Sequence, residues 1–201
     1  WIDLIEKYKN PQDEVDIAFI GKYVAHLDSY ESLKEALLHG GIANRLKVNL
    51  HYIDSEFLTP ENALEQLEKM DGVLVAPGFG ERGMEGKITA IQIARTGNMP
   101  FFGICLGMQM AIVEFARNVV GISGANSGES KPNHIENVID LMPEQEGHLE
   151  TGGTMRLGSQ VTVLKKGSRI AKMYNKTTIS ERHRHRYEVM DEFVPRLEKA
   201  G

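Results

Sequence analysis

A short apolar run leads into a cysteine flanked by glycines in the segment Met99-Pro100-Phe101-Phe102-Gly103-Ile104-Cys105-Leu106-Gly107. The run before Gly103 predicts a β-strand, and the residues after Cys105 predict a helix. Gly-x-Cys-x-Gly at such a boundary is the thiol form of the nucleophile elbow, a sharp strand-to-helix turn that needs small neighbours around a strained residue. The segment therefore predicts a strand–turn–helix unit that lifts the sulfur above the sheet.

Cys105 is the only cysteine in the chain, and it has two interpretations. A lone cysteine is most often a small buried hydrophobe. At an elbow it instead faces the N-terminus of the next helix, whose dipole and free N–H groups lower the pKa of a thiol and favour the nucleophilic thiolate. The two flanking glycines favour the nucleophile. One cysteine permits no internal disulfide, which favours a reducing, cytoplasmic location.

Strand-like and helix-like segments alternate along the chain as far as the helix after Cys105. Residues 73–76 are continuously apolar, as is typical of a parallel strand buried on both faces. The alternation predicts an α/β fold with an open, mostly parallel, doubly wound sheet and flanking helices, and such folds place ligand sites at the carboxyl ends of strands. The predicted strands are 15–20, 46–53, 73–76 and 101–104, and the predicted helices are 29–38 (ended by Gly40-Gly41), 60–70, 86–96 and 106–118.

The two ends of the chain depart from this alternation. Residues 1–9 predict a short amphipathic helix, so that residues 1–11 are either the remnant of an interdomain linker or a packed cap. Polar residues with Gly and Pro over 120–153 predict long loops. The last predicted elements are strands at 158–164 and 179–189 and a helix at 191–199.

Composition excludes several classes of protein. The 201 residues, 41% hydrophobic and 25% charged, are enough for one core, which we assign to a domain of residues 12–201. The formal charge of −5 argues against a dedicated nucleic-acid binder, and no residues form a zinc-ligand set. No apolar run has the length of a membrane span, and the first residues do not resemble a signal peptide. A chain that begins at Trp1 is expected to be a piece of a longer protein.

A glycine-rich loop follows the predicted strand 73–76, in Val75-Ala76-Pro77-Gly78-Phe79-Gly80. As a phosphate cradle it lacks the lysine and Ser/Thr of a Walker loop and the spacing of a Rossmann fingerprint. A plain tight turn is the simplest alternative. Beside a cysteine elbow, an oxyanion hole is favoured, because attack of a thiolate on an amide carbonyl creates a negative oxygen that backbone N–H groups stabilise.

The densest basic run is Arg182-His183-Arg184-His185-Arg186-Tyr187. As a strand it places the arginines on one face and the histidines on the other. The stripe is too short for nucleic acid in an acidic chain, and the two histidines lack further metal ligands, so solvated or structural histidines are favoured. An arginine of this run is suited to a substrate carboxylate through a bidentate pair.

Together these segments resemble the class I (triad) glutamine amidotransferases and, within them, the glutaminase domains of CTP synthases. The resemblance covers nearly the whole chain and implies the flavodoxin-like fold of that class. Its segments are Gly21-Lys22-Tyr23, residues 37–41, Gly78 to Gly83, Gly103 to Gln109, residues 152–158 and residues 181–189; Gly-Thr-Met-Arg-Leu-Gly and Arg-His-Arg-His-Arg-Tyr indicate the CTP synthase group.

The resemblance implies that Cys105 attacks the side-chain amide of L-glutamine, releases ammonia and leaves a glutamyl thioester that water hydrolyses. Leu106 supplies one oxyanion N–H. Most relatives carry Gly-Gly where this chain has Pro77-Gly78. Proline has no N–H, so we assign the second oxyanion donor to Gly78.

The resemblance also implies the residues that bind glutamine. Phe79 packs against its side chain, and Gln109 helps to hold it. Glu129, by default a surface carboxylate, takes the α-ammonium group. Arg186 holds the α-carboxylate.

A larger enzyme is implied as well. The family passes ammonia to an upstream synthetase domain of the same polypeptide, which uses ATP and Mg²⁺ to convert UTP to CTP. GTP stimulates the reaction, and the loop of Glu81, Arg82 and Gly83 behaves as a lid. This domain itself is expected to need no cofactor or metal, to act in a homotetramer, and to bind neither nucleic acid nor membrane.

The sequence departs from the family at the general base. The family carries the base and its orienting carboxylate in a His-Pro-Glu segment beyond the arginine–histidine strand, and residues 1–201 do not include it. We expect the intact protein to supply this pair, because His183 and His185 lie in a substrate-binding segment. Two alternatives remain, namely a glutaminase that feeds another ammonia acceptor and a catalytically dead regulatory module of the same fold.

Overall fold

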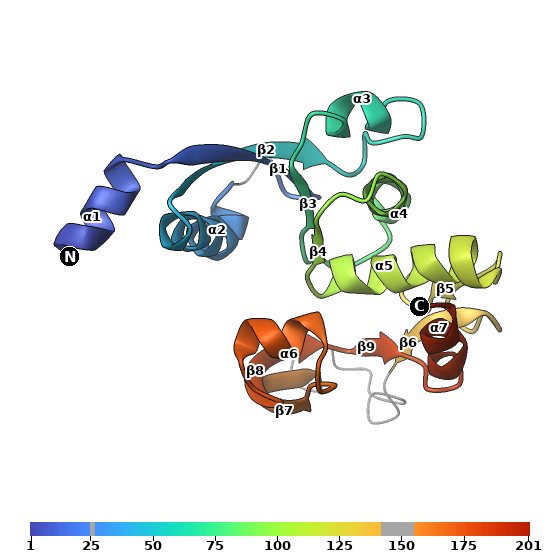
Figure 1. Cartoon of the computed structure of the whole chain (residues 1–201). Coiled ribbons are helices and arrows are strands. Elements are labelled where there is room, and N and C mark those ends of the chain that lie inside the picture. The colour runs from blue at the N-terminus through green and yellow to red at the C-terminus, as the bar shows by residue number, and fades with distance from the viewer. Residues whose placement is uncertain (25–26, 142–154) are drawn as a thin grey trace.

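The computed structural model describes residues 1–24, 27–141 and 155–201. Its central sheet has four parallel strands in the order β2-β1-β3-β4 (Figure 1). The chain moves from β1 to one side for β2 and then crosses to the other side for β3 and β4, which is the doubly wound topology. The predicted fold class is confirmed. The strands are β1 (Asp13–Gly21), β2 (Leu46–Asp54), β3 (Gly72–Val75) and β4 (Phe101–Gly103).

Alternate residues of β1 and β3 build two apolar layers, one on each face of the sheet. Ala18 and Ile20 belong to the larger cluster, which includes residues of α4 and α5. Phe19 and Leu74 face the other way, where Leu33 and Leu37 of α2 pack. All four residues of β3 are buried, as its continuous apolar run predicts. The helices are α2 (Glu31–Ala43), α3 (Ala63–Leu67), α4 (Met84–Thr96) and α5 (Leu106–Phe115), and a π-helical turn (Ala116–Val120) follows α5.

Several predicted helix boundaries are wrong. Gly40-Gly41 does not end α2, which continues to Ala43. A Cβ atom at Gly41 would lie 2.7 Å from the carbonyl oxygen of Leu46, so this glycine lets the helix lie close to β2. The helix predicted at 60–70 is shorter and spans only Ala63–Leu67.

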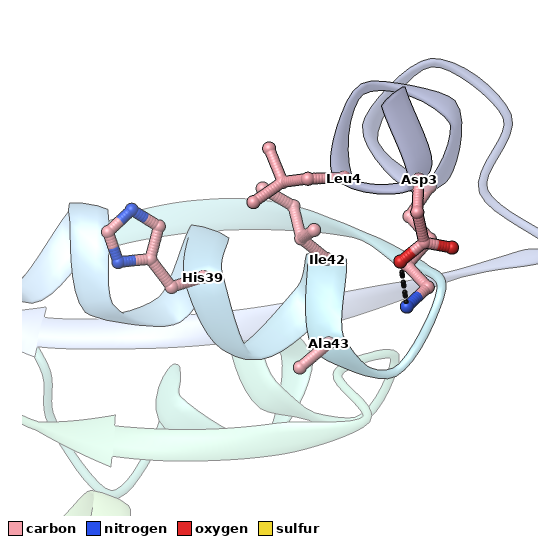
Figure 2. A pocket seen from close by; sticks show the side chains of 6 residues that line it. Asp3, Leu4, His39, Ile42 and Ala43 are labelled. Carbon is pink, nitrogen blue, oxygen red and sulfur yellow. Dashed lines mark ion pairs between the residues drawn. The ribbon is translucent and has the colours of Figure 1, made fainter. Parts of the chain in front are cut away.

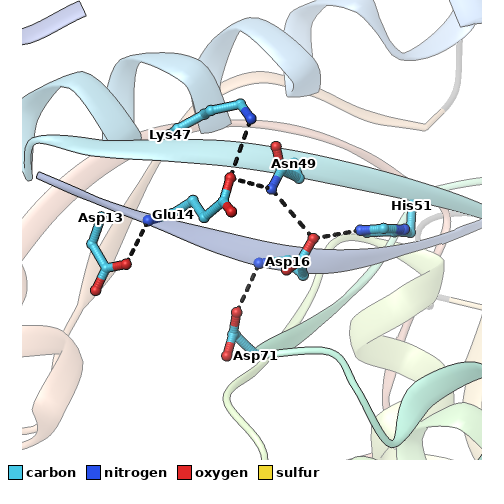
Figure 3. A network of polar contacts seen from close by, with 7 residues as sticks. All are labelled: Asp13, Glu14, Asp16, Lys47, Asn49, His51 and Asp71. Carbon is cyan, nitrogen blue, oxygen red and sulfur yellow. Dashed lines mark hydrogen bonds and ion pairs between the residues drawn. The ribbon is translucent and has the colours of Figure 1, made fainter. Parts of the chain in front are cut away.

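The first halves of β1 and β2 carry a polar ladder instead of a core (Figure 3). Glu14 pairs with Lys47, and Asp16 lies 2.6 Å from the Nε2 atom of His51. Burial of β1 becomes complete only from Ala18 to its end. The core therefore lies beneath the carboxyl end of the sheet, where the predicted site residues follow the strands.

The region predicted as loops over 120–153 contains two strands, so that prediction is wrong for its described part. These strands are β5 (Asn126–Ser127) and β6 (Asn137–Leu141), and they form a three-stranded sheet with β9 (Tyr187–Val189). Residues 142–154 lie outside the described residues.

The strand predicted at 179–189 is broken at Arg186. Its first part, β8 (Thr178–His185), forms an antiparallel hairpin with β7 (Arg156–Val163), while its last part, β9, pairs with β6. The chain thus changes sheets at Arg186. In Figure 1 the hairpin lies beside α6 (Arg169–Tyr174), and α7 (Val194–Ala200) lies near β6.

The first helix, α1 (Ile2–Lys9), packs only lightly on the chain. A cavity separates it from the end of α2 and is lined by Leu4, His39, Ile42 and Ala43, with the Asp3–Lys7 ion pair at its rim (Figure 2). None of the residues of α1 is buried. The assignment of residues 1–11 to a linker remains a prediction.

Candidate active site

Cys105 begins α5 in a strained conformation, with φ +52° and ψ −112°. A positive φ is rare for a residue with a side chain and marks a turn held by its surroundings. A Cβ atom at Gly107 would lie 2.1 Å from the carbonyl oxygen of Val75, and one at Gly103 would lie 2.7 Å from the carbonyl oxygen of Gly107. Both glycines are therefore needed for strand, turn and helix to approach one another. The predicted elbow is confirmed.

The pKa of the Cys105 thiol is shifted in the direction opposite to the prediction. Burial raises the pKa of the thiol and outweighs the hydrogen bond from the N–H of Leu106; the charge of Glu129 also raises this pKa, while Lys87 and Arg184 lower it. The expectation of a lowered pKa is wrong here because the helix N-terminus competes with desolvation. The thiol points toward the carbonyl oxygen of Arg184, 3.8 Å away.

Two cavities meet at Cys105. One, of about 560 Å³, lies between α5 and the β8–β9 segment and includes Gln109 and Tyr187 in its walls. The other, of about 510 Å³, reaches the glycine-rich loop and Tyr30. The residues that line both are Ile104, Cys105, Arg182 and Arg184. The sulfur thus lies where a substrate could enter from either side.

The glycine-rich loop lies beside the elbow, as the oxyanion-hole hypothesis requires. Pro77, Gly78 and Phe79 line the same cavity as Cys105. Gly78 is buried, and a Cβ atom on it would lie 3.6 Å from a side-chain carbon of Leu106. The two residues predicted to supply oxyanion donors are therefore neighbours. Half of Phe79 is exposed, so its ring remains available to a ligand.

Gln109 and Glu129 come to the site from different elements. Gln109 lies one turn beyond Cys105, is buried, and donates from Nε2 to the carbonyl oxygen of Tyr187 at 3.0 Å. Glu129 follows β5 and accepts a hydrogen bond from the N–H of Gly80 at 2.5 Å. Glu129 is therefore bound to the glycine-rich loop, and its role in substrate binding remains a prediction.

Arg186 lies at the bend between β8 and β9. Burial raises the pKa of Tyr187, the negative charge of Glu129 raises it further, and Arg186 lowers it. Glu129 and Arg186 thus act on the same phenol. Arg182 and Arg184, on the preceding strand, are the arginines found in the walls of both cavities.

Arg82, one of the predicted lid residues, is held near the end of β1. Arg82 forms an ion pair with Glu56 and donates to the carbonyl oxygen of Lys22 at 3.3 Å. Its guanidinium carbon lies 5.7 Å from the ring centre of Tyr23, a cation–π contact. Gly83 has φ +72° and starts α4, and Glu81 is exposed.

The two histidines of the basic run contact each other. The Nδ1 atom of His183 lies 3.0 Å from Nε2 of His185, and Nδ1 of His185 lies 3.0 Å from the carbonyl oxygen of Tyr187. Burial lowers the pKa of His185, and His183 and Arg156 lower it further. These contacts fit the structural role favoured for this pair.

Two buried lysines lie near the site, and neither of them was assigned a role there from the sequence. Lys87 is fully buried and donates from Nζ to the carbonyl oxygen of Ala76 at 2.7 Å. Burial, and next the charge of Lys22, lowers the pKa of Lys87 to about 7. Lys22 is 3% exposed. The only sequence signal was the position of Lys22 directly after an apolar strand.

The pKa of Lys87 predicts a pH-dependent stability. Between about pH 7 and the ordinary lysine pKa of about 10.4, the unfolded chain binds a proton that the folded chain does not. The free energy of unfolding should therefore rise with pH by about 1.4 kcal/mol per unit. Lys87→Met removes this contribution. The free energy of unfolding of the wild type should therefore rise relative to that of the variant as pH rises.

Urea unfolding of the wild type and the variant at several pH values above about 7 measures this difference. Lys172→Met, at an exposed lysine of α6, is the control. A difference between wild type and Lys87→Met that does not change with pH contradicts the prediction.

The described parts of the chain contain neither a cluster of metal ligands nor a helix that could span a membrane. Within residues 1–24, 27–141 and 155–201, no three His, Cys, Asp or Glu side chains lie close enough to hold a metal ion. In the same ranges no helix has the length and apolar character needed to cross a bilayer.

Known proteins match both the sequence and the fold. The sequence profile of glutamine amidotransferase class-I matches residues 25–199. CTP synthase of Flavobacterium psychrophilum is 51% identical over all of this chain and 37% of that protein. CTP synthase of Maridesulfovibrio salexigens is 52% identical over all of this chain and 39% of that protein. The chain thus spans less than two fifths of the length of these relatives.

A solved structure gives the same result at the level of fold. The glutaminase domain of Trypanosoma brucei CTPS, with acivicin bound, superposes with a TM-score of 0.85 at 41% identity. The match covers 93% of this chain and 72% of that one. By sequence profile, full-length relatives and fold alike, the chain belongs to the class I glutamine amidotransferases, among the glutaminase domains of CTP synthases.

Proposed function

We propose that this chain hydrolyses L-glutamine through a thioester on Cys105 and, within a longer polypeptide, supplies ammonia for the ATP-dependent amination of UTP to CTP. The observation that carries this proposal is the strained elbow, which places Cys105 between two cavities and beside two candidate oxyanion donors. Family membership supports the same reaction.

The chemistry divides between the sulfur and the backbone. The Cys105 thiolate adds to the amide carbon of glutamine, and the N–H groups of Leu106 and Gly78 stabilise the resulting oxyanion by roughly 3–4 kcal/mol each. The C–N bond then breaks, the nitrogen takes a proton and leaves as ammonia, and water hydrolyses the thioester to glutamate. The elbow and the glycine-rich loop bring together the nucleophile and the proposed oxyanion donors of this reaction.

The thiol needs a base, because burial raises its pKa. A histidine oriented by a carboxylate is the usual partner of such a nucleophile. We propose that the His-Pro-Glu segment of the family supplies this pair in the intact protein. The His183–His185 contact and the bond from His185 to the Tyr187 backbone leave these two imidazoles a structural role.

The remaining polar groups suit the ends of the substrate. Glu129 takes the α-ammonium group while its Oε1 atom accepts from the Gly80 N–H. Arg186 takes the α-carboxylate, Gln109 positions the glutamine, and the half-exposed ring of Phe79 packs against its methylene groups. A site that binds both the α-ammonium and the α-carboxylate group selects free glutamine over a glutamine residue in a peptide.

The wider assembly is proposed from the family resemblance, and the greater length of the relatives supports a longer polypeptide. We propose an upstream synthetase domain that binds ATP and Mg²⁺, activation by GTP through the loop of Glu81, Arg82 and Gly83, and a homotetramer in the cytoplasm. Neither nucleic acid nor membrane is a proposed partner, and the glutaminase site itself takes no cofactor.

The test uses the full-length protein that carries this chain, supplied with UTP, ATP, Mg²⁺, GTP and L-glutamine. We expect glutamate and CTP to appear together. Glutamate without CTP would assign the ammonia to another acceptor. No glutamate, from a protein that still makes CTP from free ammonia, would leave a regulatory module of the same fold.

Arg186→Ala should raise the KM for glutamine. Loss of a charge-assisted bidentate contact is worth roughly 1.5–3 kcal/mol, about 10- to 150-fold in KM. Initial rates of glutamate release over a range of glutamine concentrations measure this change. Arg184→Ala is the comparison, because Arg184 lines both cavities. A normal KM for Arg186→Ala with a raised KM for Arg184→Ala would move the carboxylate site to Arg184.

A further inference from the structure

The buried ammonium group of Lys22 binds the glycine-rich loop. It follows directly on β1, is 3% exposed, and donates from Nζ to the carbonyl oxygens of Phe79 and Gly80. Burial lowers the pKa of Lys22, and the charge of Glu129 opposes this effect. A cation at such a depth is stable only with acceptors in place, and the loop carbonyls are those acceptors.

The peptide unit between Phe79 and Gly80 is held at both ends. Its oxygen accepts from Lys22, and its N–H donates to Glu129 at 2.5 Å. Rotation of this unit would break both contacts at once. The loop therefore has one preferred orientation although Gly78 and Gly80 give it little conformational restraint of its own.

The methylene stem of Lys22 also lies beside the proposed oxyanion donor. A Cβ atom at Gly78 would lie 3.4 Å from Cε of Lys22 and 3.6 Å from Cδ2 of Leu106. Gly78 is thus packed between the lysine stem and the residue after the nucleophile. Lys22 thus binds the loop at Phe79 and Gly80 and lies beside Gly78.

We propose that Lys22 is a positioning residue for glutamine hydrolysis, which orients the Gly78–Gly80 backbone so that the N–H of Gly78 faces the oxyanion formed at Cys105. This inference rests on the proposed glutaminase function. Lys22 itself contacts no reacting atom; it acts through the two carbonyls that it binds and the glycine on which it packs.

Lys22→Met keeps the stem and removes the donors. We expect kcat for glutamine hydrolysis to fall by about 10- to 100-fold, with a smaller change in KM, because the oxyanion forms only after binding. Lys22→Arg, which keeps the charge and several donors, should restore part of kcat. Lys34→Met, at an exposed lysine of α2, should behave as the wild type.

The readouts separate loop positioning from other roles. Iodoacetamide, which needs no oxyanion hole, should alkylate Cys105 of Lys22→Met at the wild-type rate, while inactivation by acivicin should slow. A raised KM with normal kcat would make Lys22 part of substrate binding and overturn the proposal. Wild-type kcat in Lys22→Met, with the wild type active on glutamine, would overturn it and leave the glutaminase function standing.

A second variant tests the mechanism if Lys22→Met folds poorly. Gly80 has φ +75° with no atom near its missing Cβ, so Gly80→Ala strains the loop without a clash. We expect it to lower kcat as Lys22→Met does, and the double variant to be little slower than either single one. Additive losses would show that Lys22 acts independently of the loop and would overturn the proposal.

Discussion

Cys105→Ala stops glutamine-dependent chemistry in the full-length protein, with a loss of about 10⁴-fold or more in glutamate release. Residues 1–201 contain no other thiol that could form the thioester. The alanine methyl group also fits the elbow, because it retains the Cβ that Cys105 already places there. The fold, and with it CTP formation from free ammonia, should therefore stay intact.

Two assays on one sample check this result: CTP formed from glutamine, and CTP formed from ammonium chloride. Cys105→Ser is the matched variant, since it keeps a hydroxyl at the same place but not the nucleophilicity of a thiolate. It should be inactive with glutamine as well. Glutamine-dependent CTP formation by Cys105→Ala at near the wild-type rate would remove Cys105 from the mechanism.

The elements that were predicted well from the sequence are those for which the residue types within the segment itself indicate the structure. Residues 73–76 read as a doubly buried strand because every side chain is apolar, and β3 is buried throughout. The elbow was readable because Gly103 and Gly107 flank the cysteine and also provide the close approach that shapes it. Local pattern and tertiary contact coincide there.

The predictions that were wrong depend on distant partners. The alternation of arginines with histidines and Tyr187 continues through Arg186. However, β8 pairs with β7 and β9 pairs with β6, and nothing within the run indicates two partners. The thiol pKa was misjudged for a related reason. The helix N-terminus is visible in the sequence, while burial by the β8 segment is not.

The buried lysines show the same limit in another form. Lysine is mostly exposed in proteins, so neither Lys22 nor Lys87 stood out as a part of the site. Each is buried because carbonyl groups at the end of β3 and in the loop after it accept its ammonium protons. The sequence does not indicate which backbone carbonyl groups will accept a hydrogen bond from a buried lysine.

Gly107→Ala should strongly destabilise the domain. The new Cβ would lie 2.1 Å from the carbonyl oxygen of Val75 and 2.8 Å from its carbonyl carbon. These are backbone atoms of a buried strand, so α5 must move away from β3. We expect a loss of more than about 3 kcal/mol in the free energy of unfolding, at the upper end of the cost of overpacking.

Gly40→Ala is the matched control, since it is the same chemical change in the interior of α2 with no atom within 4 Å of the new methyl group. It should stabilise the fold by about 0.5–1 kcal/mol, because alanine loses less backbone entropy than glycine in a helix. Urea unfolding of both variants gives the comparison. Stability changes of the same sign would mean that α5 does not lie as close to β3 as the elbow requires, and the oxyanion geometry at Leu106 would lose its support with it.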